Sequence, residues 1–299
     1  MPIVQINIMK TKPLTFLLAL TFMFLFSGSS VVFGDDLRDG LLAYGTKDYK
    51  KAYKLILSLA EQGNVMAQTT LGVMYQEGHG VPKDYKEAVK WHRLGAERGY
   101  AIAQHNLGVM YLEGYGVPQD YKEAFKWERL AAKQENTHAQ NNLGVMYDKG
   151  HGVSQDFKEA IKLYQLSAKQ GYAEAQNNLG VMYNKGRGVP QNYKEAIKWV
   201  GLAAEQGFGH AQTNLGGMYE KGQGVPQDYK EAVRLYRLAA EQGFAPAQYN
   251  LGAMHFEGLG VPQDHKEAVK WFRLAAKQGI ARAHEALDLF LGRKGQKLL

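Results

Sequence analysis

The 299-residue sequence contains no cysteine. This absence excludes disulfide bonds, thiol nucleophiles, Cys-ligated zinc or iron–sulfur sites, and a lipidated cysteine anchor. Proline is also scarce, with 8 residues, whereas glycine is abundant, with 34. With 45% hydrophobic and 22% charged residues, the composition is that of a folded protein and excludes a disordered tail or a collagen.

The sequence also lacks a concentrated charge of one sign. Its formal net charge of +7 is mild, and lysines alternate with glutamates along the expected helix surfaces. Nucleic-acid binding by counterion release requires basic side chains gathered on one face. We therefore expect no nucleic-acid partner.

The amino-terminal segment has the features of an export signal. Lys10 and Lys12 precede the apolar run Leu14–Phe26, which small residues follow. This run would rise only about 20 Å as a helix, less than the roughly 30 Å hydrocarbon core of a bilayer. We expect residues 1–34 to be a signal peptide that is cleaved after Gly34, in a periplasmic or secreted bacterial protein. Cleavage near Ser29 and an uncleaved anchor, the only expected membrane contact, are the alternatives.

A strict internal repeat decides the expected fold. The dipeptide Leu-Gly recurs every 36 residues, with its glycine at Gly72, Gly108, Gly144, Gly180, Gly216 and Gly252. The period places six full repeats in 64–279. We expect 35–63 to be a partial first repeat that caps the array, and 280–299 to be a capping helix with a basic tail.

Each repeat contains the pattern of two helices, A and B. In the first full repeat, helix A carries Ala67, Leu71 and Tyr75 on one stripe. Its Leu-Gly glycine costs roughly 1 kcal/mol relative to alanine, which indicates that helix B crosses too closely for a side chain. Helix B begins at Asp84, with Glu87 three residues later, the spacing of a capping box.

One repeat junction departs from the pattern. Glu135 occupies a position that is glycine in the other repeats, and Ser154 replaces the proline of the following loop. A non-glycine residue must then take the helix-ending conformation or pass it to Asn136. We therefore expect a softer joint between the second and third full repeats. Gly216-Gly217 is a second candidate flexible point.

The repeated residues carry a family resemblance. The pattern A-x-x-x-L-G-x-x-Y-x-x-G-x-G-V-P-x-D-Y-x-x-A-x-x-W-x-x-x-A-A-x-x-G resembles the Sel-1-like repeats, relatives of the tetratricopeptide repeats, from Asp35 to about Leu291. This resemblance implies an all-α fold, a right-handed α/α superhelical solenoid of helix-turn-helix repeats that serves as an adaptor for proteins. One exported branch of the family is cysteine-rich and has been linked to penicillin binding. The absence of cysteine means that neither its disulfides nor that activity is transferred to this chain.

A helical wheel identifies the face of helix A that points away from the apolar stripe, and tetratricopeptide-like stacking would line a concave groove with it. This face differs most between repeats, as partner recognition requires. A solvated surface without a ligand is the alternative. The candidate partner-binding residues are His105, Leu112, His138, Asn141, Asp148, Glu174, Asn177, Asn184, His210, Thr213, Glu220, Tyr249 and Phe256. The recurring row Asn106, Asn142, Asn178, Asn214 and Asn250 is interpreted as structural, bridging adjacent helices by hydrogen bonds.

Catalytic patterns are weak. After residue 34 the only serines are Ser58, Ser154 and Ser167, and none has lysine three residues later. His284-Glu285 begins like a zincin motif, but Asp288 stands where the second histidine is required. We predict no catalytic residues, no metal and no cofactor.

The sequence therefore predicts an exported, monomeric, non-catalytic scaffold that binds a protein or peptide partner through the concave face of its repeats, in the cell envelope or in host contact. Two alternatives remain. One is a cell-wall hydrolase or modulator, favoured only by the family association, and the other is a self-associating spacer.

Overall fold

The computed structural model describes residues 35–296, and side chains up to residue 290. The expected signal peptide lies outside these residues. Every regular element in the described range is a helix, as the sequence predicts. The helices are α2 (Asp35–Gly45), α3 (Tyr49–Glu61), α4 (Val65–Glu77), α5 (Tyr85–Glu97), α6 (Ala101–Glu113), α7 (Tyr121–Lys133), α8 (Thr137–Lys149), α9 (Phe157–Lys169), α10 (Ala173–Lys185), α11 (Tyr193–Glu205), α12 (Gly209–Lys221), α13 (Tyr229–Glu241), α14 (Ala245–Glu257), α15 (His265–Lys277) and α16 (Ala281–Gln296).

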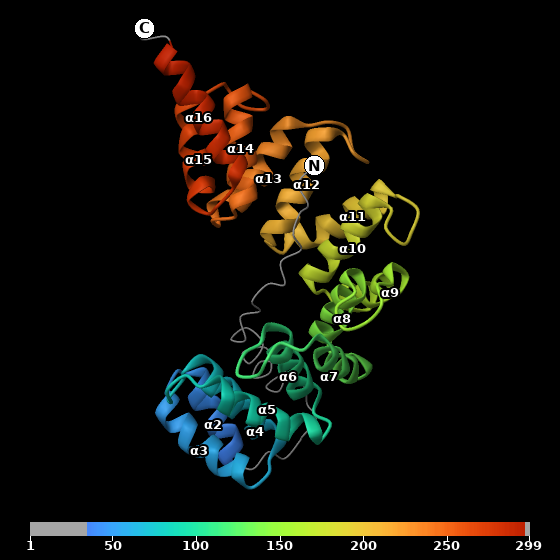
Figure 1. Cartoon of the computed structure of the whole chain (residues 1–299), viewed down its shortest axis with the longest axis vertical. Helices are drawn as coiled ribbons and strands as arrows, with labels where there is room; N and C mark the ends of the chain where they lie inside the picture. The colour runs from blue at the N-terminus through green and yellow to red at the C-terminus, as the bar shows by residue number, and fades with distance from the viewer. Residues whose placement is uncertain (1–34, 297–299) are drawn as a thin grey trace. The chain divides into compact units, whose positions relative to one another are not determined.

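The helices group into two compact units. Unit 1 holds α2 to α8 and unit 2 holds α9 to α16, with the division after Asp156. In each unit, successive helices pack side by side (Figure 1). Even-numbered helices from α4 to α14 are the predicted A helices, and odd-numbered helices from α5 to α15 are the B helices. None of the helices described between residues 35 and 296 is long and apolar enough to cross a membrane.

The loop between helices A and B uses two glycines in the left-handed region. Gly78 ends α4 with φ of 75°, and Gly80 has φ of 77°. A Cβ on Gly80 would collide with the backbone carbonyl of Tyr49, the first residue of α3. The loop of one repeat therefore packs on the B helix of the preceding repeat, which explains why a second glycine follows so closely.

The predicted N-caps of the B helices are confirmed at Asp84, Asp120, Asn192, Asp228 and Asp264, but the capping box does not close. In α7, Oδ1 of Asp120 accepts hydrogen bonds from the backbone amides of Lys122 and Glu123, at 2.9 and 3.1 Å. The amide of Asp120 donates instead to the carbonyl of Tyr111 in helix A, at 2.9 Å. That bond takes the donor with which the glutamate of a capping box would pair.

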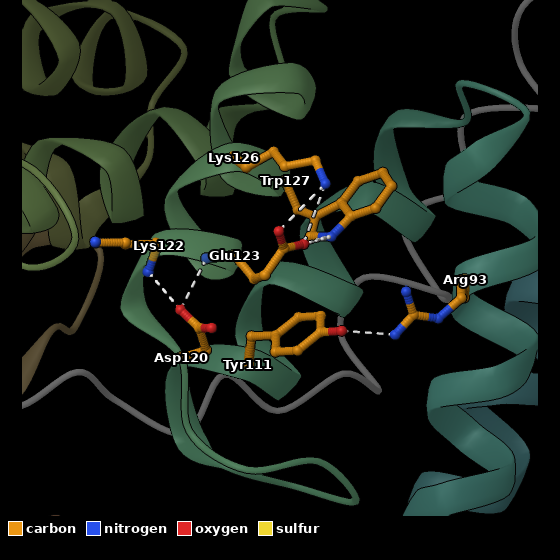
Figure 2. A network of polar contacts seen from close by, with 7 residues as sticks. All are labelled: Arg93, Tyr111, Asp120, Lys122, Glu123, Lys126 and Trp127. Carbon is orange, nitrogen blue, oxygen red and sulfur yellow. Dashed lines mark hydrogen bonds and ion pairs between the residues drawn. The ribbon is translucent and has the colours of Figure 1, made fainter.

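The carboxylate of Glu123 is consequently free to pair with other side chains of α7. It accepts hydrogen bonds from Nζ of Lys126 and Nε1 of Trp127, both at 3.2 Å, and the Lys126 ammonium lies over the indole ring (Figure 2). On the same side of the repeat, Nη2 of Arg93 donates to the hydroxyl of Tyr111, at 2.6 Å (Figure 2).

The Leu-Gly glycines lie where helix B crosses helix A, as expected. A Cβ on Gly72 would lie 2.6 Å from the ring of His92, and one on Gly252 would lie 2.8 Å from the ring of Phe272. The contacting side chain comes 20 residues after the glycine in each case. We call this helix B position, occupied by His92, Glu128, Tyr164, Val200, Tyr236 and Phe272, the crossing position.

Glu135, rather than Asn136, takes the left-handed conformation that ends the helix. Its φ is 60°, whereas the equivalent Gly99 and Gly171 have φ of 85° and 89°. A side chain at such a φ is strained, because Cβ approaches the following carbonyl.

Candidate functional site

The candidate partner-binding residues lie on one side of the A helices, which we call the inward face, and none of them is fully exposed. His105, Leu112, Asn141, Asp148, Glu174 and Asn177 are buried, and His138, Asn184, His210, Thr213, Glu220, Tyr249 and Phe256 are half-buried. This face is therefore not simply a solvated helix surface. Its role in binding remains a prediction.

Contacts between neighbouring helices account for part of this burial. In unit 1, the rings of His105 on α6 and His138 on α8 stack with centroids 5.7 Å apart. In unit 2, Nδ2 of Asn214 on α12 donates to Oδ1 of Asn177 on α10, at 2.8 Å. Within each unit, neighbouring A helices thus touch along the inward face.

The predicted structural role of the asparagine row is confirmed at two positions. Asn214 bridges α12 and α10 as described above. Asn142 on α8 donates through Nδ2 to Oε1 of Glu128 on α7, at 3.0 Å.

Unit 1 holds a polar cluster that the sequence analysis did not identify. Glu128 is wholly buried at the crossing position of α7. Its Oε2 lies 3.0 Å from Nδ1 of His105, while Oε1 accepts the hydrogen bond from Asn142. His92 occupies the crossing position of α5 and is also wholly buried. The sequence does contain a sign of this cluster, because the crossing position changes from His and Glu in the first two full repeats to Tyr, Val and Phe in the later ones.

Burial dominates the protonation of two of these histidines. Burial, and then the charge of His105, lowers the pKa of His92 to about 3. The same two causes lower the pKa of His138 to about 4. Both imidazoles are therefore neutral at pH 7.

The inward face of unit 2 becomes more aromatic towards the carboxyl end. Oε2 of Glu220 on α12 accepts a hydrogen bond from the hydroxyl of Tyr236, at 2.5 Å. Tyr249 on α14 packs on the ring of Phe272, with centroids 5.6 Å apart, and Phe256 packs on His265 at 5.1 Å. The half-buried side chains of this face offer amide, carboxylate and aromatic surfaces in turn.

The B helices carry a row of exposed leucines, which we call the outer leucine row. Leu166, Leu202, Leu238 and Leu274 of unit 2 recur every 36 residues and are 37 to 50% exposed. This row was not predicted from the sequence.

The pattern of these helix pairs matches a known family model. The model described as Sel1 repeat matches residues 37–64, 65–100, 101–136, 137–172, 173–208, 209–244 and 245–280. The chain belongs to the Sel1 repeat family.

Two solved structures extend this likeness. A Sel1 repeat protein from Oxalobacter formigenes is 32% identical, with a TM-score of 0.77 over 81% of this chain and 97% of that one. A protective antigen present in uropathogenic Escherichia coli strains, which displays an SLR fold, is 37% identical. Its TM-score is 0.71 over 89% of this chain and 57% of the antigen, so the present chain spans little more than half of it. No curated protein matches the chain.

Sel1 repeat proteins are generally scaffolds for protein–protein interaction, and their fold is typically non-catalytic. In the part of this Sel1 repeat chain that the structure describes, no three His, Asp or Glu side chains meet as metal ligands would.

Proposed function

We propose that this Sel1 repeat chain is an exported scaffold that binds a protein or peptide partner along the inward face of its A helices. The observation that carries the proposal is the contrast between a constant frame and a variable face. The Leu-Gly pair of helix A recurs in all six full repeats, whereas the inward column through Asn184, Glu220 and Phe256 changes from amide to carboxylate to aromatic. Change concentrated on one face of a repeated frame is how solenoid proteins acquire specific partners.

The partner that best fits unit 2 is an extended segment with basic and apolar side chains. The carboxylate of Glu220 can accept hydrogen bonds from a lysine or an arginine. Tyr249 and Phe256 can bury apolar groups. These three side chains are half-buried, so each keeps some surface for a partner.

The amino-terminal pattern of Lys10, Lys12 and Leu14–Phe26 supports export. The Escherichia coli relative is described as a protective antigen. A role in the cell envelope or in host contact is consistent with that description.

Affinity capture from the native cell envelope tests the proposal. The bait would be the parent protein, an inward-face variant carrying Asn184→Arg and Tyr249→Ala, or an outer-face control carrying Leu202→Ala and Leu238→Ala. Proteins retained by the parent and the control but lost by the inward-face variant would support the scaffold. Identical capture by all three baits would contradict the binding face, provided that the baits have equal helicity.

A further inference from the structure

The crossing position differs in chemistry between the two units. In unit 2, Val200, Tyr236 and Phe272 lie against Gly180, Gly216 and Gly252, and all three are at most 4% exposed. In unit 1, the crossing position is held by His92 and Glu128, which are wholly buried against Gly72 and Gly108. Unit 1 therefore carries ionisable groups where unit 2 carries none that titrates near neutral pH.

The ionisable groups of unit 1 meet across four helices. His92 comes from α5, His105 from α6, Glu128 from α7 and His138 from α8. Glu128 contacts His105 directly, and the His105 ring stacks on that of His138. The neighbour that α4 presents to His92 is Gly72, whose missing side chain leaves room for the imidazole.

His92 lacks compensation for a charge. Neither of its ring nitrogens has a hydrogen-bond partner in the described part of the chain. The ionisable neighbour acting on it is His105, whose positive form would repel an imidazolium at His92. A buried charge without a hydrogen bond or a counter-ion is strongly destabilising, so protonation of His92 requires the surrounding packing to open.

Glu128 makes its contacts with His105 and Asn142. A proton taken up by His92 is therefore matched by no hydrogen-bond acceptor among the described residues.

We propose that unit 1 is a pH-responsive element, in which mild acid loosens the packing of α5 to α8 more than that of unit 2. The loosening alters the inward face, to which His105 and His138 belong. This pH response does not require a partner and goes beyond the proposed scaffold function.

The direction of the effect follows from proton linkage. The pKa of His92 is about 3 and that of His138 is about 4 in the folded chain, against about 6.5 for an exposed histidine. Open or unfolded chains then bind more protons than folded chains below about pH 6.5. The stability of unit 1 is present at neutral pH and is lost progressively as the pH falls from about 6.5 towards 4. For His92 alone, the linkage gives roughly a 30-fold shift of the opening equilibrium at about pH 5.

Hydrogen exchange of the purified full chain at pH 7.5 and pH 5.0 tests the proposal, after correction for the intrinsic exchange rate. We expect protection of α5 to α8 to fall at least tenfold at pH 5.0, and that of α11 to α15 to fall by a smaller factor, which burial of His210 and His255 would cause by lowering their pKa values. The matched variant is His92→Phe, since Phe272 already fits against Gly252 in the same chain. It is expected to remove most of the pH dependence, while Tyr236→Phe in unit 2 leaves it unchanged.

Equal loss of protection in both units would overturn the proposal, as would unchanged pH dependence in a folded His92→Phe protein. Should His92→Phe not fold, imidazole NMR of the parent decides. Titration of His92 and His138 below pH 5 supports the device, and titration of both at or above pH 6 overturns it.

Discussion

Gly216 of α12 lies directly beneath the ring of Tyr236 on α13. A Cβ on Gly216 would lie 2.7 Å from Cε1 of Tyr236, closer than two carbon atoms can approach without rearrangement. At the adjacent Gly217, the nearest group to such a Cβ is the hydroxyl of Tyr236, at 3.5 Å, an ordinary contact. Of these two consecutive helical glycines, only Gly216 is required by packing against Tyr236.

Alanine at these two glycines should therefore have opposite effects. We expect Gly216→Ala to destabilise the protein by about 1–3 kcal/mol, because the ring of Tyr236 must move. Gly217→Ala should stabilise it by up to about 1 kcal/mol through helix propensity. Urea denaturation measures both values. Two changes of the same sign would show that the crossing contact does not explain the Leu-Gly glycine.

Glu135 provides a second test of local strain. We expect Glu135→Gly to stabilise the protein by about 1 kcal/mol, because glycine adopts a φ of 60° without strain. The reverse change, Gly171→Ala, should destabilise it by a similar amount, since its Cβ would meet nothing within 4 Å and the cost would come from backbone conformation. Denaturation midpoints decide between this account and one in which Glu135 has a favourable contact that outweighs its strain.

The softer joint at residues 133–156 remains a prediction that hydrogen exchange can test. Protection across this segment should be lower than across 169–192, which spans the equivalent junction one repeat later and carries Gly171 and Pro190. Uniform protection of the two segments would contradict the softer joint.

The N-caps of the B helices give a third prediction about stability. Asp228 accepts a hydrogen bond from the amide of Glu231, at 3.0 Å. Asp228→Ala should destabilise the protein by about 1 kcal/mol, whereas Asp228→Asn should be nearly neutral. Asn192 already caps α11 in the same manner, through the amide of Glu195 at 3.1 Å, which makes asparagine the matched control. Equal losses in the two variants would indicate that the charge matters rather than the cap.

The export hypothesis predicts a defined amino terminus. Protein purified from the native cell envelope should begin at Asp35, if cleavage follows Gly34. Intact-mass measurement reads this directly. A mass that includes residues 1–34 would instead support the uncleaved anchor.

The 36-residue spacing predicts contacts within a repeat better than contacts between repeats. The spacing of the Leu-Gly pair and of Asp84 predicts the helix pairs, the N-caps and the close helix crossing, because these depend on neighbours in one repeat. The meeting of His105 and His138 depends instead on how successive A helices pack. The helical wheel that placed both residues on one face contains no information about that distance.

Glu128 shows a different limit of sequence reasoning. Charged side chains on helices are mostly exposed, so a glutamate in a helix rich in lysine and arginine is expected at the surface. Its burial follows from its place in the column of His92 and Phe272, which only comparison of all six repeats at that one position could reveal. The loop glycines, by contrast, are explained by their left-handed φ and were predictable from residue type alone.

The central claim is that the inward face of the A helices binds the partner. It is tested most directly by calorimetry of the captured partner with two single variants, inward Tyr249→Ala and outward Leu274→Ala, in proteins of equal thermal stability. Our account predicts at least tenfold weaker binding for Tyr249→Ala and parental affinity for Leu274→Ala. Parental affinity for Tyr249→Ala together with weakened binding for Leu274→Ala would contradict it and assign binding to the outer leucine row.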